Sequence, residues 1–384
     1  MNKQWMQFAN DIKALYQKNF VPLHEPTFSD TEIEYVTDCV KTGWVSSVGT
    51  YVTRFEEDLA KYVGVKRAVA VVNGTAALHI ALKVAEVMAE DEVLMPSLTF
   101  IATANAVSYL GAVPHFIDVS IDTLGVDSAK LRTYLEEITE VCNGETFNKK
   151  TGRRIKALVP MHTFGHPVAL DELVSICDDF NIVLVEDAAE SLGSYYKGKH
   201  TGSFGKISAI SFNGNKIITT GGGGAIVTND EALADYAKYL TTTAKIPHRW
   251  AYEHDEIGYN YRLPNINAAL GCAQLEKMPE LVAQKRTLTD KYESLIVNIQ
   301  GVKLYKESAH CKSNYWLQTL ILDESYNRDE VLAFLNDNGV MSRPIWTPMH
   351  KLEMFKECPK MDLIATEALD GRIINIPSTP IKED

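Results

Sequence analysis

Hydrophobic and polar positions alternate over the first two thirds of the chain in a way that predicts strands separated by helices. Short apolar runs bounded by turn-forming residues predict buried strands at Arg67–Val72, Glu92–Met95, Val113–Asp118, Lys156–Pro160 and Ile182–Glu186. Apolar residues at helical spacing predict helices at Ala76–Ala89, Thr99–Leu110 and Ala169–Phe180. Short apolar strands joined by helices imply an α/β fold with a mostly parallel sheet flanked by helices.

This alternation fades after Thr228. Helices are predicted at Glu231–Thr243 and Asn265–Ser294, and a further strand and helix are predicted at Tyr315–Leu322 and Arg328–Asn336. We therefore expect three parts: a polar N-terminal arm over residues 1–27, a large domain over residues 28–246 and a smaller C-terminal α+β domain over residues 247–384.

Composition narrows the functional classes. A chain of 384 residues with 46% apolar residues can bury a sizeable core, and its net charge of −12 argues against a nucleic-acid binder. No apolar run approaches the roughly 20 residues of a membrane helix, and residues 1–19 do not resemble a signal peptide. The six cysteines are scattered and predict neither disulfides nor a metal site. A cytoplasmic enzyme is the natural expectation.

Three segments place residues that can bind a ligand or react at the expected carboxyl ends of strands, where open α/β sheets bind ligands. The first is Asn73-Gly74-Thr75-Ala76, between a predicted strand and a helix. Glycine permits close approach of the backbone, and the free N–H groups of a helix start favour a phosphate. The alternative is an ordinary strand–helix turn capped by Thr75.

The second segment is Ile182–Ser191, in which an apolar strand runs into Glu186 and Asp187. A buried carboxylate is costly unless it is paired, and a pyridinium N–H is a suitable partner. A helix N-cap and a metal site are the alternatives, but no histidine at a suitable spacing supports the metal.

The third segment is Ile207–Gly224, where a strand ending at Ser211 is followed by a loop that carries Lys216 and by the glycine run Gly221–Gly224. A lysine desolvated in such a loop can act as a nucleophile and a proton carrier. A surface lysine on a flexible loop is the alternative interpretation.

In this order, the three segments and Gly258-Tyr259-Asn260-Tyr261-Arg262 resemble the DegT/DnrJ/EryC1/StrS sugar aminotransferases, which have pyridoxal phosphate (PLP) fold type I. The likeness covers about residues 20–350. It implies that Lys216 holds PLP as a Schiff base and then moves a proton, and that Asp187 pairs with the ring nitrogen. The presence of Lys216 argues against the dehydratase branch of the family, which carries histidine there.

The resemblance also assigns other cofactor contacts. Glu190 matches a residue near the 3-hydroxyl group of PLP, Phe100 matches the aromatic residue stacked on the ring, and three residues match phosphate ligands: Gly74, Thr75 and Ser211. Asn260 resembles a phosphate ligand donated across a homodimer interface, so that active sites would be shared. One departure is Gly222, where much of the family has glutamate.

The likeness is closer to the branch that aminates C4 of UDP-linked 4-keto-6-deoxy-N-acetylhexosamines on legionaminic acid or bacillosamine routes, with glutamate as the expected donor. Ser46, His162 and Arg262 are the predicted substrate ligands, and weaker candidates are Phe164, His248 and Arg343. Arg343–Trp346 either closes the pocket or packs the small domain. The alternatives are a GDP-4-keto-sugar or 3-keto-sugar aminotransferase and, from another class, a non-catalytic PLP-fold regulator that binds a sugar nucleotide.

Overall fold

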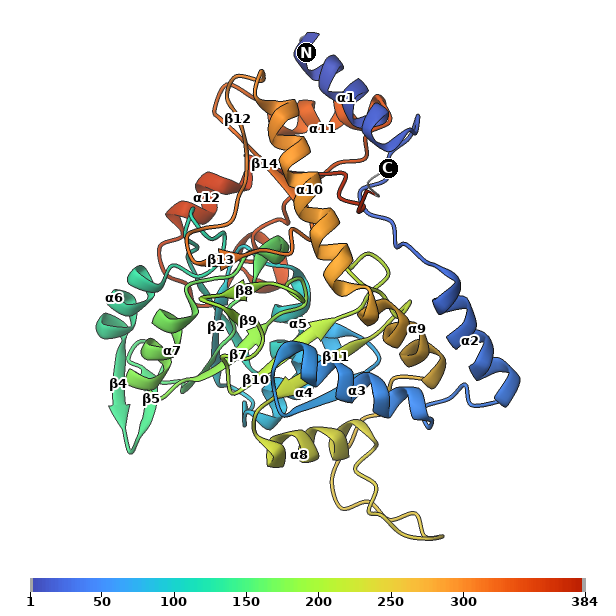
Figure 1. Cartoon of the computed structure of the whole chain (residues 1–384). Coiled ribbons are helices and arrows are strands. Elements are labelled where there is room, and N and C mark those ends of the chain that lie inside the picture. Colours follow the sequence, from blue (N-terminus) through green and yellow to red (C-terminus); the bar gives the residue numbers. More distant parts are fainter. Residues whose placement is uncertain (1–2, 382–384) are drawn as a thin grey trace.

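Seven strands form the central sheet of the computed structural model, which describes residues 3–381 (Figure 1). They are β1 (Arg67–Val71), β2 (Glu92–Pro96), β3 (Val113–Ile117), β6 (Ile155–Leu158), β7 (Val183–Asp187), β10 (Ile207–Ser211) and β11 (Gly224–Thr228). Their order is β1-β11-β10-β7-β6-β2-β3, and β11 is antiparallel to both of its neighbours while the remaining pairs are parallel. The expected mostly parallel sheet is confirmed.

Helices cover both faces of this sheet because successive strand residues point to opposite sides. Ala68 and Ala70 of β1 share a core with α3 (Thr50–Val63) and α9 (Asn265–Glu276), whereas Val69 and Val71 pack on the side of α4 (Gly74–Val84). The other covering helices are α5 (Ile101–Tyr109), α6 (Ser128–Ile138), α7 (Leu170–Asp179) and α8 (Glu231–Thr241). The strands are therefore buried on both faces, as their continuous apolar runs predicted.

The single helix expected over Asn265–Ser294 is wrong, because the structure has two helices there. α9 ends at Glu276 and α10 spans Met278–Ile296. Pro279 lies in the first turn of α10, where its missing N–H costs nothing, whereas in the middle of one continuous helix it would remove a hydrogen bond.

A four-stranded antiparallel sheet forms the core of the C-terminal part, seen at the top of Figure 1. Its strands are β12 (Val302–Leu304), β14 (Gln318–Leu322), β16 (Ile373–Ile376) and β15 (Arg343–Pro344), flanked by α10 and α11 (Arg328–Asp337). The N-terminal arm also packs here: α1 (Lys3–Tyr16) buries Trp5, Phe8 and Ile12 in the same cluster as Tyr292 of α10. The domain boundary at residue 246 stays a prediction.

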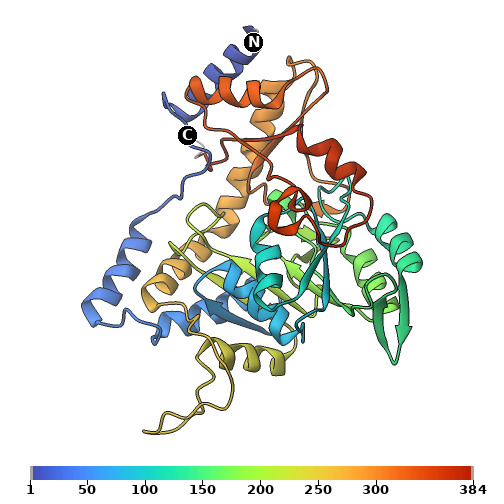
Figure 2. The same cartoon turned by 180° about the vertical axis from the view of Figure 1, so that it is seen from behind.

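Many elements were not predicted from the sequence. Besides α1, α3, α6, β11, β12, β15 and β16, they include α2 (Asp30–Thr42), β4 (Thr139–Cys142), β5 (Glu145–Asn148), β8 (Tyr195–Tyr196), β9 (Lys199–His200), β13 (Cys311–Lys312), α12 (Ile364–Asp370), η1 (Thr163–Gly165), η2 (Met349–Lys351) and η3 (Glu353–Phe355). The long connection between α8 and α9 projects away from the rest of the molecule (Figures 1 and 2). Across residues 3–381, every helix is too short or too polar to cross a lipid bilayer.

Candidate active site

A cavity of about 340 Å³ lies at the carboxyl edge of the central sheet. Lys216 and Asp187 both line it, although they follow different strands, β10 and β7. The other lining residues are Asn73, Gly74, Thr75, Leu78, Phe100, Ala102, Met161, Ala189, Glu190, Ser211, Asn213, Asn215, Trp316 and Trp346. The three segments that carried chemistry in the sequence therefore meet at one place, as parallel strands require.

The turn after β1 supplies one end of the cavity. Asn73 caps α4, since its Oδ1 accepts a hydrogen bond of 2.8 Å from the N–H of Ala76. The alternative of a cap by Thr75 is therefore wrong. A Cβ atom on Gly74 would lie 2.8 Å from the Cβ of Ser211, so this approach of turn to strand requires glycine.

Asp187 ends β7 with its carboxylate buried at the cavity. Its Oδ2 accepts a hydrogen bond of 2.6 Å from the Thr103 hydroxyl, and its Oδ1 accepts one of 3.2 Å from the N–H of Ala189. Burial raises the pKa of Asp187, and these hydrogen bonds and the charge of Lys216 only partly oppose that rise. A cation placed in the cavity would favour the ionised carboxylate.

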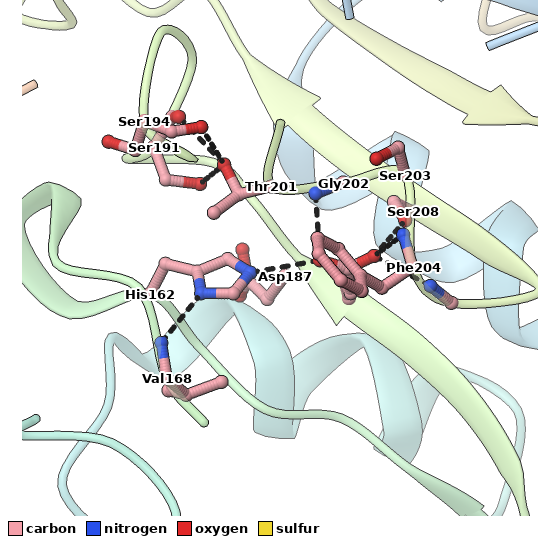
Figure 3. A network of polar contacts seen from close by, with 12 residues as sticks. His162, Val168, Asp187, Ser191, Ser194, Thr201, Gly202, Ser203, Phe204 and Ser208 are labelled. Atoms are coloured by element: carbon pink, nitrogen blue, oxygen red, sulfur yellow. Dashed lines mark hydrogen bonds and ion pairs between the residues drawn. The ribbon is translucent and has the colours of Figure 1, made fainter. Parts of the chain in front are cut away.

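The adjacent acid, Glu186, lies in a separate network of hydrogen bonds with His162 and with the backbone around Gly202, two residues that Figure 3 labels. Its carboxylate accepts hydrogen bonds from the N–H groups of Gly202 and Gly205, both at 2.7 Å, and lies 3.1 Å from His162 Nε2. Burial alone would raise the pKa of Glu186, but the hydrogen bonds from His162 and the backbone outweigh burial and lower it. The two neighbouring acids therefore have separate surroundings.

His162, expected near the sugar, has no surface exposure in the chain. Its Nδ1 accepts a hydrogen bond of 3.4 Å from the N–H of Val168, which assigns the proton to Nε2, the atom facing Glu186 (Figure 3). Both ring nitrogens are thus engaged within the protein, and the structure does not bring His162 to the lining of the cavity.

Lys216 reaches into the cavity from the loop after β10. Its Nζ lies 3.2 Å from Glu190 Oε1 and 3.8 Å from the centre of the Trp316 ring, a cation–π contact. Trp316 is itself fixed by a hydrogen bond of 2.7 Å from its Nε1 to the Asn215 carbonyl. Sequence reasoning missed Trp316, because no local pattern connects it with the lysine loop.

Glu190 links the lysine to the turn at η1. Its second oxygen, Oε2, accepts a hydrogen bond of 2.9 Å from the N–H of Phe164. Phe164 has a left-handed backbone (φ 55°), which is strained for a bulky residue, and this hydrogen bond helps to hold it there. Burial raises the pKa of Glu190 to about 7, against the lowering effect of Lys216.

Aromatic side chains form another wall. The ring of Phe100 lies 6.1 Å from that of Trp346, and Trp346 lies 5.0 Å from Phe164, measured between ring centres. Phe100 keeps 47% of its surface exposed although it borders the cavity, so its open face is available to a ligand.

Besides His162 and Phe164, five sequence candidates do not line this cavity. The carbonyl of Ser46 accepts a hydrogen bond of 2.6 Å from the N–H of Asn265, and the guanidinium of Arg262 donates to Asn260 Oδ1 at 3.1 Å. His248 lies in the projecting connection and Arg343 lies in β15, and both are exposed.

The residues present fit PLP. The cavity combines an amine, a buried carboxylate suited to a ring N–H, an exposed aromatic face and a glycine-lined helix start suited to a phosphate. The close packing of Gly74 on Ser211 leaves no room for a side chain at that helix start, which keeps its N–H groups accessible.

Comparison with known proteins agrees with this geometry. Residues 26–383 match the model of the DegT/DnrJ/EryC1/StrS aminotransferase family. The chain is 42% identical to the aminotransferase EpsN of Bacillus subtilis, over 87% of this chain and 83% of EpsN. It is 37% identical to a GDP-perosamine synthase of Escherichia coli O157:H7, over 94% of each chain. A DegT/DnrJ/EryC1/StrS aminotransferase structure from Brucella abortus superposes with a TM-score of 0.82 at 28% identity, over 92% of each chain.

The match spans nearly the whole chain and includes both the central sheet and the C-terminal part. The named relatives include GDP-perosamine synthases, and none of those reported above is named for a legionaminic acid or bacillosamine route. The chain belongs to the DegT/DnrJ/EryC1/StrS aminotransferase family and is a PLP-dependent aminotransferase.

Proposed function

We propose that the chain transfers an amino group from glutamate to the 4-keto carbon of a nucleotide-linked 4-keto-6-deoxy sugar. The observation that carries the proposal is the presence of Lys216 and Asp187 in the lining of one cavity. An amine and a buried carboxylate on the same cavity are the two groups that a PLP transaminase requires.

PLP, when bound, supplies a ring that accepts electrons from the substrate carbon. Lys216 holds the cofactor covalently and, when free, carries a proton to and from the substrate carbon. Glu190 and the ring of Trp316 keep the ammonium of Lys216 close to the cavity, since they contact its Nζ at 3.2 and 3.8 Å. Asp187 keeps the ring nitrogen protonated.

The remaining cofactor contacts follow from the same cavity. Gly74, Thr75 and Ser211 would bind the phosphate at the start of α4, where the helix dipole favours an anion. Phe100 would stack on the ring with its exposed side, and Glu190, which lines the same cavity, would contact the 3-hydroxyl region.

Replacing Lys216 tests the proposal directly. Lys216→Ala should abolish turnover and remove the absorbance band near 400 nm that arises from covalently held PLP. Lys291→Ala, at an exposed position of α10, should leave both unchanged. Normal activity in Lys216→Ala would contradict the assignment.

Replacing Asp187 separates cofactor binding from cofactor activation. Asp187→Asn keeps the shape and the Thr103 contact but removes the negative charge. We expect the protein to retain PLP while proton abstraction slows by several orders of magnitude, measured by stopped-flow absorbance after adding glutamate. An unchanged rate would exclude Asp187 as the partner of the ring nitrogen.

Two nucleotides compete for the substrate assignment. The sequence resemblance favours a UDP-linked 4-keto-6-deoxy-N-acetylhexosamine. The GDP-perosamine synthases among the relatives, at 34–37% identity, favour a GDP-linked 4-keto sugar. Incubation of the glutamate-treated enzyme with both keto-sugars and with a 3-keto analogue, followed by mass spectrometry, distinguishes them: only the true substrate should gain the amine and restore the PLP spectrum.

A homodimer with shared active sites completes the proposal. Asn260 and Arg262 lie outside the cavity of their own chain, in the returning part of the connection between α8 and α9. This connection exposes large apolar side chains at Trp250, Tyr252 and Ile257. Exposed apolar side chains on one projecting segment favour a protein contact.

A further inference from the structure

A chain of three polar side chains joins the end of β2 to the C-terminal part of the protein. Ser97 follows β2 directly, and its Oγ lies 2.7 Å from His350 Nδ1. His350 Nε2 lies 2.7 Å from Glu367 Oε1 on α12. The backbone strengthens the link, because the N–H of Met349 donates to the Ser97 carbonyl at 2.8 Å and the N–H of His350 donates to Ser97 Oγ at 3.3 Å. We call Ser97, His350 and Glu367 the clamp.

One placement of protons satisfies every contact of the clamp. With a neutral imidazole protonated at Nε2, that N–H donates to the Glu367 carboxylate, and Nδ1 accepts from the hydroxyl of Ser97. The lone pairs of Ser97 Oγ remain available to accept from the His350 backbone. The Glu367 carboxylate is also paired with Lys351 at 2.5 Å, which fixes the outer end.

The clamp has the serine–histidine–carboxylate composition of a hydrolase, but its geometry serves a different purpose. Ser97 has no exposed surface, so no substrate reaches its hydroxyl. It contacts Nδ1 rather than Nε2, and Glu367 is the half-exposed member. A fully paired polar chain that is buried at its inner end fixes the relative position of the segments that carry it.

Those two segments carry the aromatic wall of the cavity. Phe100 lies three residues after Ser97, and Trp346 lies four residues before His350. Their rings lie 6.1 Å apart, and both line the cavity. In Figure 2 the red turns of the C-terminal segment lie against the large domain, where Met349 meets Ser97. Phe100 and Trp346 therefore come from distant parts of the chain and are held together beside the clamp.

We propose that His350 and Ser97 are positioning residues, which hold Trp346 against Phe100 so that the cavity is formed before the nucleotide sugar binds. The inference rests on the proposed function of this cavity. Without the clamp the two rings separate, and the substrate must order them on binding, which costs affinity. The effect falls on KM for the nucleotide sugar more than on kcat, because neither residue touches the reacting atoms.

Two substitutions at position 350 separate the two ends of the clamp. In His350→Asn the shorter amide reaches the former place of Nδ1 and retains a hydrogen bond to Ser97. In His350→Gln the longer amide reaches the former place of Nε2 and retains only the bond to Glu367. Ser97→Ala removes the inner bond from the other side.

The variants are compared as PLP-loaded proteins in steady-state assays with the nucleotide sugar that the wild type accepts, and by hydrogen–deuterium exchange of residues 98–104 and 345–352. We expect Ser97→Ala and His350→Gln to raise KM about tenfold, change kcat less than threefold and speed exchange in both segments. His350→Asn should change KM less than threefold and leave exchange close to that of the wild type.

Unchanged KM and unchanged exchange in both Ser97→Ala and His350→Gln would overturn the proposal. Equal effects of His350→Asn and His350→Gln would overturn it as well, since the bond to Ser97 would then be irrelevant. The exchange measurement requires no turnover. If the wild type aminates none of the keto-sugars but the exchange pattern holds, the proposed function fails and the clamp remains.

Discussion

At the scale of the residue, Glu190 occupies an unusual position because its two oxygens serve two different partners. One oxygen contacts the ammonium of Lys216, and the other holds the strained backbone of Phe164. Its carboxyl is buried, and burial raises the pKa of Glu190 to about 7. The charge of this side chain therefore changes near neutral pH, whereas an exposed glutamate would remain ionised there.

This pKa gives a testable pH dependence of stability. Because the folded protein keeps a proton on Glu190 that the unfolded chain releases above its ordinary pKa of 4.5, the stabilising contribution is complete below 4.5 and is lost as pH rises through 7. At 1.36 kcal/mol per unit, the loss amounts to at most about 3 kcal/mol. In cofactor-free protein, the melting temperature of Glu190→Gln should therefore fall less between about pH 5 and 8 than that of the wild type.

The matched measurement is differential scanning calorimetry of both proteins in the same buffers. All other titrating groups are shared, so only the difference between the two curves reports on Glu190. Parallel curves would show that the carboxyl does not titrate in this range.

Individual site residues were predictable where they belong to a local motif. Asp187 ends a buried strand, the turn at Gly74 and the loop with Lys216 follow two others, and the sheet brings the ends of parallel strands together. Trp316 and Trp346 were not predictable in this role, because they reach the cavity from the C-terminal part through contacts made only in the folded chain. The geometry of His162 could not be predicted either, since the sequence does not show which of the adjacent acids, Glu186 or Asp187, contacts it.

At the scale of the element, β11 shows why glycines follow the lysine loop. β11 begins with Gly224, which pairs with Val71 and Ser211 on its two sides. A Cβ atom on Gly224 would lie 2.5 Å from the carbonyl carbon of Asn73, the cap of α4. The glycine therefore lets the strand lie against the turn that lines the proposed phosphate site.

Gly224→Ala should destabilise the protein by about 2 kcal/mol, because the added methyl group displaces the turn at Asn73. The same displacement should weaken PLP binding, measured by equilibrium dialysis. Gly371→Ala is the control, since a Cβ there meets no atom within 4 Å and its φ of −87° suits alanine. Equal stability of the two variants in urea unfolding would refute the steric argument.

Element boundaries show where sequence patterns have limits. Six of the seven strands of the central sheet were predicted because they are buried on both faces and therefore continuously apolar, whereas β11, which begins at the end of the glycine run, was not. The break between α9 and α10 depends on Pro279, and the spacing of apolar residues alone does not reveal this break. Helix α1 was not predicted, because its apolar residues Trp5, Phe8 and Ile12 stand in a segment that is polar as a whole.

At the scale of the whole molecule, the projecting connection between α8 and α9 is the segment that we propose to contact a second copy of the chain. Trp250 is 74% exposed and Ile257 is 81% exposed. If this segment packs on a second copy, the wild type should sediment as a dimer, and Trp250→Ser combined with Ile257→Ser should shift it towards monomer with loss of activity.

The control for this experiment is Val297→Ser, at a position 75% exposed on the C-terminal part. It removes an exposed apolar side chain far from the projecting connection in sequence and should leave the dimer intact. Sedimentation velocity of the three proteins at the same concentration shows whether each is a monomer or a dimer. A monomeric wild type with full activity would exclude shared active sites.

The packing of α1 has a consequence for the newly made chain. Its apolar residues Trp5, Phe8 and Ile12 emerge from the ribosome well before their partner Tyr292, which is synthesised on the order of 280 residues later. At 5–20 residues per second, the helix waits for roughly 15–60 s without its binding surface. The nascent N-terminus is therefore a natural client for chaperones that shield apolar segments during translation.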